Sequence, residues 1–268
     1  MKTISYNLRK NRALGEIGDL ADRHEADVLC LQEADAVALP AELGHMRLVH
    51  ATENNRLGLA MYVRAERYQV RTARTFRLKK SLHDRVLTPA NERLLGARLH
   101  DREVGRDVVV ASFHAAPLTA LNSLRRHQIS TALAELRVLG PGLPALMVGD
   151  YNYPVFQGRL DRHLEGEGFE LNLSDRRTYT RYRMFRGHFD FATSTGLQIE
   201  SVRTLDRGMS DHLPILVQAG LSGVGGADRA AVRAPRRTQR TRRAMAAEAS
   251  SSFAAATSPP SAAASATQ

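Results

Sequence analysis

Several residue types and patterns are scarce in this chain of 268 residues, and each scarcity excludes a class of protein. The single cysteine, Cys30, rules out an internal disulfide, and its apolar neighbours predict a small buried side chain rather than a reactive thiol. No apolar run reaches the length of a membrane span, and the first residues lack the apolar core and cleavage site of a secretory signal. We therefore expect a cytoplasmic protein without a membrane span.

Acidic residues are outnumbered, since 28 Asp and Glu stand against 38 Lys and Arg and leave a net charge of +10. A basic balance favours polyanionic partners such as nucleic acid. Seven arginines lie between residues 229 and 243, in a region of Gly, Ala, Ser and Pro with almost no large apolar residues. We expect one domain over 1–219 and a disordered tail over 220–268. A solvated linker and a nucleic-acid-binding arm are equally consistent with this arginine cluster.

Residues 1–219 alternate between strand-like and helix-like patterns. Helical spacing begins at Ala13, and a longer helix is predicted over 121–139, before Gly140 and Pro141. Short apolar or alternating runs predict strands at 3–7, 28–31, 57–63, 93–99, 108–113, 145–148, 189–192 and 215–217. This mixture predicts packed sheets covered by helices, but periodicity does not distinguish a Rossmann sheet from a sandwich of two sheets.

Polar residues stand where several of these strands begin or end. They are Asn7, Glu33, His114, Asp150, Asn152, Asp190, Asp211 and His212. Each has an ordinary structural explanation, such as a turn or helix cap for Asp150 or a satisfied core histidine for His212. Their number is harder to explain, because a carboxylate beside an apolar run is costly to bury without a partner. Carboxylate and amide oxygens suit Mg²⁺, and histidines add proton transfer near neutral pH.

The order of these motifs, from Lys2 to about Val217, resembles that of the endonuclease/exonuclease/phosphatase superfamily. The Gly-Asp-Tyr-Asn and Ser-Asp-His-Leu-Pro motifs are specific as a pair, although either alone is a weak signal. The resemblance implies an α/β fold, a four-layer sandwich with two central mixed β-sheets flanked by helices and a site at one edge. Asn91-Glu92-Arg93 and His114-Ala115-Ala116-Pro117 look most like the deoxyribonuclease branch.

The same resemblance implies roles at the metal and at the attacking water. Glu33 would be the main ligand of Mg²⁺ or Mn²⁺, helped by Asn7 and Asp211. Asp150 would orient or deprotonate the water, and Asn152 would hydrogen-bond a phosphate oxygen.

Three further positions would act on the phosphate side. His212 would contact the phosphate or transfer a proton, oriented by Asp190. His114 would be a second histidine beside the phosphate, and Arg93 would contact substrate phosphate.

Two departures from the family pattern qualify the deoxyribonuclease likeness. Pancreatic deoxyribonucleases carry a glutamate at the position that aligns with Leu57, and here the nearest glutamate is Glu53. Abasic-site endonucleases carry a tyrosine in place of His114 and a tryptophan near the late strand, whereas this chain contains no tryptophan.

We therefore expect a divalent-metal-dependent hydrolase of phosphodiester bonds, a monomeric nuclease acting on DNA or RNA. One alternative is a phosphatase or phosphodiesterase on inositol, lipid or nucleotide phosphates, because fold and site do not fix the substrate. Another is a non-catalytic module that binds nucleic acid, which the intact set of motifs disfavours. The sequence does not separate endonuclease from exonuclease action.

Overall fold

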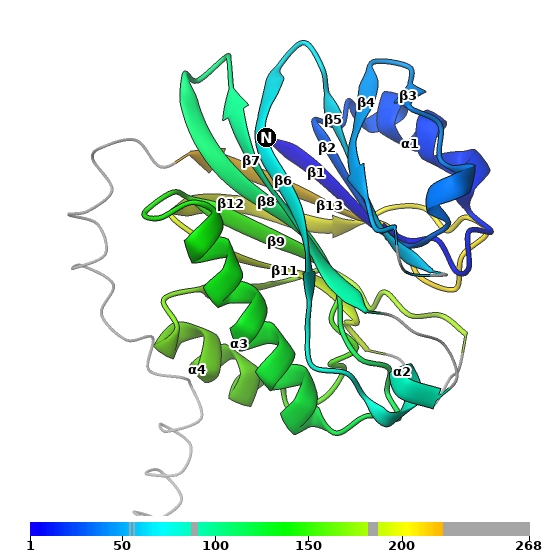
Figure 1. Cartoon of the computed structure of the whole chain (residues 1–268), viewed down its shortest axis with the longest axis vertical. Coiled ribbons are helices and arrows are strands. Elements are labelled where there is room, and N and C mark those ends of the chain that lie inside the picture. The colour runs from blue at the N-terminus through cyan, green and yellow to red at the C-terminus, as the bar shows by residue number, and fades with distance from the viewer. Residues whose placement is uncertain (54, 56, 87–90, 182–186, 222–268) are drawn as a thin grey trace, which may run out of the picture. The chain divides into compact units, whose positions relative to one another are not determined.

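A computed structural model describes residues 1–53, 55, 57–86, 91–181 and 187–221 (Figure 1). The last described strand extends to Leu221, and the chain from Met1 to Ser222 forms one compact unit. The predicted disordered tail, with its arginine cluster, lies outside the described residues apart from its first two positions.

Two mixed β-sheets form the centre of the molecule. The seven-stranded sheet has the order β12-β13-β1-β2-β5-β4-β3, and the six-stranded sheet has the order β10-β11-β9-β8-β7-β6. The seven-stranded sheet consists of β1 (Lys2–Asn7), β2 (Val28–Ala34), β3 (Glu42–Leu43), β4 (Met46–Ala51), β5 (Gly58–Arg64), β12 (Leu197–Thr204) and β13 (Ile215–Leu221). The six-stranded sheet consists of β6 (Tyr68–Arg77), β7 (Glu92–Asp101), β8 (Arg106–His114), β9 (Ala145–Asp150), β10 (Glu170–Leu173) and β11 (Asp190–Thr195). Each sheet contains one parallel pair, β1 with β2 and β8 with β9.

Three of the described helices lie on the outer faces of the two sheets, whereas the short second one lies in the connection between β6 and β7 (Figure 1). The described helices are α1 (Ile17–His24), α2 (Leu82–Val86), α3 (Asn122–Leu139) and α4 (Gln157–Gly166), with short 3₁₀ turns at Leu14–Glu16 and Ala36–Ala38. Among the described residues, no helix is long and apolar enough to span a membrane.

Three buried apolar clusters separate four layers. One cluster joins α1 to the seven-stranded sheet through residues such as Ile17 and Leu29. The middle cluster lies between the sheets and includes Cys30 and Val148. The third packs α3 and α4 on the six-stranded sheet, for example through Leu133. The expected four-layer sandwich is therefore confirmed, as is the burial of Cys30.

Gly149, just before the predicted catalytic Asp150, is required by the close approach of β8 and β9. Its φ is +152°, and a Cβ at this position would lie 1.9 Å from the carbonyl oxygen of Phe113. Phe113 is the register partner of Gly149 across the parallel pair. Any larger residue therefore displaces the strand end that carries Asp150.

We predict that Gly149→Ala destabilises the fold by about 1–3 kcal/mol, because the new methyl group meets backbone rather than a movable side chain. Gly158→Ala is the matched control, since a Cβ there meets nothing within 4 Å, and it should change stability by less than about 0.5 kcal/mol. Urea unfolding of both variants measures the difference. Equal stability of the two would show that the β8–β9 contact relaxes freely.

Candidate active site

The ends of strands from both sheets meet at one edge of the sandwich. In the parallel pair β8–β9, His114 lies opposite Asp150. In the antiparallel pair β9–β11, Asp150 lies opposite Asp190. His212 comes from the segment before β13, in the other sheet. The fold thus gathers residues far apart in sequence because neighbouring strands end together.

Polar side chains link the two sheets at this edge. The Asn7 side-chain amide, at the end of β1, donates to Asp150 Oδ2 at 3.1 Å. The Gln32 side-chain amide, in β2, donates to Ser112 Oγ in β8 at 2.9 Å. Both residues are buried, so each bond satisfies groups that would otherwise be left unpaired.

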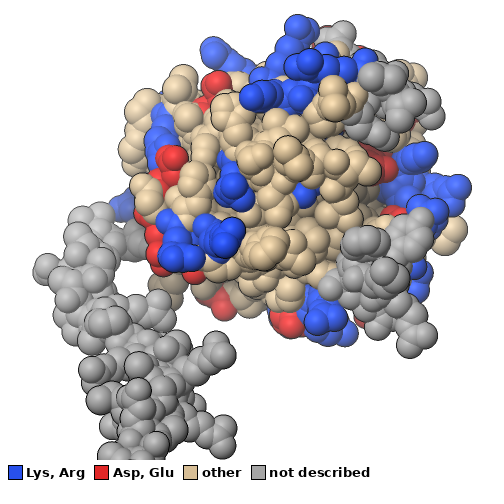
Figure 2. Space-filling model, turned by 90° about the horizontal axis from the view of Figure 1, so that it is seen from below, with Lys and Arg blue, Asp and Glu red and all other residues tan. Residues whose placement is uncertain are grey.

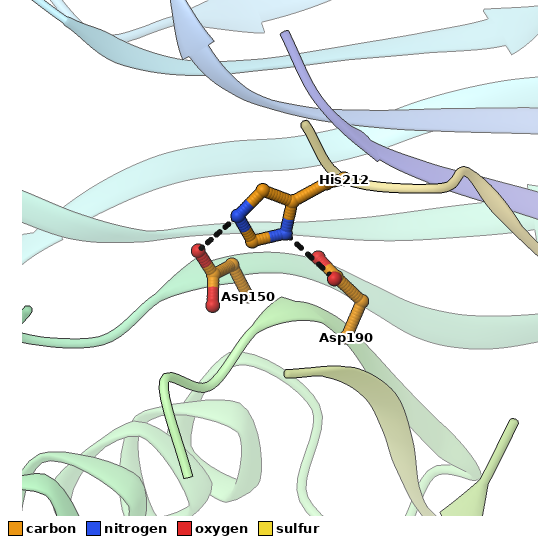
Figure 3. Close-up of side chains that lie close together, drawn as sticks. All are labelled: Asp150, Asp190 and His212. Carbon is orange, nitrogen blue, oxygen red and sulfur yellow. Dashed lines mark hydrogen bonds and ion pairs between the residues drawn. The ribbon is translucent and has the colours of Figure 1, made fainter. Parts of the chain in front are cut away.

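The His212 imidazole lies between two buried carboxylates, as Figure 3 shows. Its Nδ1 is 2.8 Å from Asp190 Oδ2, and its Nε2 is 3.7 Å from Asp150 Oδ2. The Nε2 atom of His114 lies 3.7 Å from the same Asp150 oxygen. The Thr178 hydroxyl accepts the backbone N–H of Asp190 at 3.0 Å and fixes the start of β11. Asp190 therefore orients the ring that faces Asp150.

The two histidines have opposite protonation. Burial lowers the pKa of His114 to about 4, and the nearby Asp150 carboxylate offsets this only in part. Burial also disfavours the charged form of His212, but Asp190 and Asp150 outweigh it and raise the pKa of His212 to about 10. Burial raises the pKa of Asp150 above its ordinary value. At neutral pH the site thus holds one neutral imidazole, His114, and one charged imidazole, His212, both near Asp150 Oδ2.

Glu33 reaches the pocket through a β-bulge. The register of β2 against β5 shifts between Gln32 and Ala34, which leaves Glu33 as the extra residue with φ of 53°. Bulges re-aim a side chain and are common beside active sites. Glu33 Oε2 accepts the backbone N–H of Lys10 at 2.8 Å.

Asn152 closes a tight turn after β9. Its φ is 48°, a left-handed conformation that asparagine tolerates, and its backbone N–H donates to Asp150 Oδ1 at 2.9 Å. The Asp150 carboxylate is therefore held on one oxygen by this amide and on the other by Asn7.

Arg93 holds the backbone beside His114. Its Nη1 donates to the carbonyl oxygens of His114 at 2.9 Å and Ala115 at 2.8 Å, and its Nη2 pairs with Asp84 of α2. The Arg93 side chain is buried, and these contacts fix the loop that carries His114. Its predicted contact with substrate phosphate stays a prediction.

A pocket of about 590 Å³ opens over these residues. Most of the predicted site residues line it, whereas Asn7 and Asp190 are buried behind the lining and contact Asp150 and His212 from there. The predicted residues in the lining are Glu33, Arg93, His114, Asp150, Asn152, Asp211 and His212. Leu57, just before β5, also lines the pocket, so an apolar residue stands at the position that aligns with the deoxyribonuclease glutamate.

Sequence reasoning missed several lining residues. Arg9, Lys10 and Arg12 line the pocket from the segment after β1, and Tyr179 and Arg181 line it from the segment before β11. The basic residues that directly follow Asn7 in sequence were a usable signal. No local pattern pointed to Tyr179 or Arg181, because their position depends on the fold of a long connection.

Comparison with known proteins agrees with this geometry. The model of the endonuclease/exonuclease/phosphatase family matches residues 4–212, from β1 to His212. The chain is a member of this family. Among curated proteins, none matches its sequence.

Solved structures share the fold at low sequence identity. A mannosyl-6-phosphatase from Bacteroides thetaiotaomicron has a TM-score of 0.67 at 16% identity, with 82% of this chain and 99% of that chain covered. The human nocturnin catalytic domain, with bound sulfate, has a TM-score of 0.64 at 17% identity, with 83% and 94% covered. TDP2 from D. rerio, complexed with a single-strand DNA product, has a TM-score of 0.65 at 14% identity, with 82% and 98% covered. Both phosphatases and nucleic-acid enzymes therefore share this architecture.

Membership of this family means that the protein hydrolyses phosphoester bonds with a divalent metal. The residues present fit such an ion. Asp150, Asp190 and His212 place possible ligand atoms within 4.8 Å of one another, but the charged His212 ring leaves the carboxylates as the donors. Asp190 Oδ1 is buried with no hydrogen-bond partner among the described residues. The lining adds the carboxylates of Glu33 and Asp211, so the donors are mainly the hard oxygens that Mg²⁺ prefers.

Asp190→Asn should lower the pKa of His212 from about 10 towards its ordinary value of 6.5, because the variant removes the nearer of the two carboxylate charges. Because the pKa of His212 is raised, the ion pair of His212 with Asp190 contributes its full stabilisation of the fold below pH 6.5. That stabilisation is lost as the pH rises through about 10. Titration of the His212 ring protons by NMR in metal-free protein measures the shift. The exposed Asp206→Asn is the control and should leave this pKa unchanged. A pKa that stays near 10 in Asp190→Asn would contradict the assignment.

Proposed function

We propose that this protein is a metal-dependent nuclease that cleaves the phosphodiester backbone of DNA or RNA. The supporting observation is the set of cationic side chains that line the pocket beside Asp150. Arg9, Lys10 and Arg12 enter it from one segment and Arg181 from another. Substrates with phosphates on both sides of the scissile bond match a pocket with cations from two directions.

The charge of the surface agrees with this proposal. In Figure 2, Lys and Arg side chains form several groups around a largely uncharged face, and Asp and Glu groups are smaller. Within the pocket, Asp211 Oδ2 lies 3.5 Å from Arg9 Nε and 3.8 Å from Arg181 Nη1. These ion pairs hold the arginines at the site, where they can contact phosphate oxygens.

The chemistry follows from the protonation states. Asp150, whose pKa is raised by burial, takes a proton from the attacking water. His212 stays an imidazolium at neutral pH and offsets charge on the phosphate oxygens. His114 is neutral and hydrogen-bonds without adding charge.

The remaining residues hold the metal and the phosphate. Glu33, Asn7 and Asp211 would hold the divalent ion, which when bound polarises the phosphate and stabilises the leaving oxygen. Asn152 contacts a phosphate oxygen from its left-handed turn.

A phosphatase acting on a small substrate is the second candidate. The fold likeness to the Bacteroides mannosyl-6-phosphatase favours it, since that protein is covered over 99% of its length. A substrate panel distinguishes the two: plasmid DNA, single-stranded DNA, RNA, an abasic duplex, inositol phosphates, a sugar 6-phosphate and sphingomyelin, each with Mg²⁺, Mn²⁺ and EDTA. Turnover of inositol or sugar phosphates without cleavage of any nucleic acid would overturn the nuclease proposal.

Removal of the metal or of its main ligand should abolish turnover. We expect no activity in excess EDTA and none for Glu33→Gln, because the neutral amide replaces the charge that attracts the cation. Calorimetric titration with Mg²⁺ should show weaker binding to Glu33→Gln than to the exposed control Glu53→Gln. Wild-type Mg²⁺ affinity in Glu33→Gln would show that another residue is the main ligand of the ion.

Asp150→Asn and His212→Ala should lower kcat by about 10²–10⁴-fold, as expected for loss of a positioned acid–base group. Asn152→Ala should mainly raise KM, because it removes a phosphate contact made before and during the reaction. Steady-state kinetics at saturating metal separate the two effects. A loss of less than about tenfold for both Asp150→Asn and His212→Ala would reject their roles.

A further inference from the structure

Strand β6 carries a row of exposed basic side chains outside the pocket. It is an edge strand of the six-stranded sheet and pairs only with β7. We define the β6 basic stripe as Arg71, Arg74 and Arg77 of this strand together with Lys79 just after it, all exposed. None of these four side chains forms an ion pair with a described residue. Four exposed positive charges therefore lie along this edge strand and the segment after it, without a described counter-charge.

The other edge strands do not share this composition. Strand β12, at one edge of the seven-stranded sheet, exposes Glu200 and Arg203, which balance each other. Strands β3 and β10 expose Glu42 and Glu170 and carry no basic residue. Charges on an edge strand prevent pairing with another chain, but either sign serves that purpose. Protection of the edge thus does not account for four charges of one sign.

The β6 basic stripe leads to the pocket. Arg77 pairs in register with Glu92, which directly precedes the pocket residue Arg93. After Lys79 the chain enters α2, where Asp84 lines the pocket and pairs with Arg93. Figure 1 shows the same path, with β6 running along the sheet edge towards the segment before α2.

We propose that the β6 basic stripe binds the sugar-phosphate backbone of a nucleic-acid substrate beyond the cleavage site. This inference rests on the proposed nuclease function. The seven residues from Arg71 to Arg77, six steps at the rise of a β-strand, span about 20 Å. A duplex strand advances about 3.4 Å per phosphate, so the stripe covers about six phosphates. The contacts are to phosphate only, and the stripe therefore binds without sequence preference.

The test compares two triple variants of the full chain with equal loss of charge. The first is Arg71→Gln/Arg74→Gln/Arg77→Gln. The matched control is Arg23→Gln/Arg47→Gln/Arg203→Gln. These three arginines are also exposed, form no ion pair with a described residue and do not line the pocket. Affinity for a long DNA duplex is titrated in EDTA at several salt concentrations, and turnover is measured on a small diester reporter with Mg²⁺.

The stripe variant should bind duplex more weakly, with a log–log salt slope shallower by about 2.7 for three lost phosphate contacts. The control should keep the wild-type slope, and reporter turnover should be unchanged in both. Equal slopes in the two variants, in an enzyme that cleaves nucleic acid, would overturn the stripe proposal alone. If the salt slope depends on the stripe but the protein cleaves no nucleic acid, the stripe would be a nucleic-acid-binding surface and the proposed nuclease function would be overturned. Weakened binding to phosphatidylserine vesicles with unchanged DNA binding would also overturn the stripe proposal.

Discussion

The pairing of the His212 imidazole with two buried carboxylates is the interaction on which the site depends. Asp150 and Asp190 are opposite each other on neighbouring strands of one sheet, whereas His212 enters from the other sheet. Two carboxylates this close repel each other unless a cation lies between them. The charged ring supplies that cation, so the end of one sheet and the loop of the other stabilise each other's buried groups.

The loop that carries His212 is held from both sheets. Ser210 Oγ donates to the Asn7 carbonyl oxygen at 2.6 Å and accepts the His212 backbone N–H at 3.1 Å. On the other side, His212 forms a bridge with Tyr179, whose ring meets the imidazole edge-on with centroids 5.0 Å apart. The His212 backbone is therefore held by Ser210, and rotation of the ring would break its contacts with Asp190 and Tyr179. Such support fixes the position of the ring relative to Asp150.

Periodicity predicted most strands, whereas the four-layer arrangement and the grouping of the site residues were predicted from the family resemblance. Asn7, His114 and Asp150 directly end apolar or alternating runs, and those runs are the strands β1, β8 and β9. Strand β6 was not predicted, because Arg71 is an extra residue in its pairing with β7 and breaks the alternation that marks a strand. The basic stripe along it was therefore not predicted either.

Other features lacked a local signal. The bulge at Glu33 depends on pairing between β2 and β5, which alternation within β2 does not reveal. Burial of Arg93 depends on α2, since Asp84 neutralises it there. Sequence identified the chemical groups of the site, whereas their charge states came from contacts between distant segments.

Backbone strain is concentrated at the same edge of the sandwich. Three consecutive residues, Arg9 to Asn11, have positive φ, as do Glu33 and Asn152. Such conformations cost about 1–3 kcal/mol for residues such as Arg9, Lys10 and Glu33 and less for asparagine, and they persist only where surrounding structure over-determines them. Here the hydrogen bonds that compensate the strain are also those of the site, because the amide of Lys10 binds Glu33 and that of Asn152 binds Asp150. The three apolar clusters stabilise the rest of the sandwich. Their stabilisation of the folded state offsets the cost of the strained turns and buried charges at this edge.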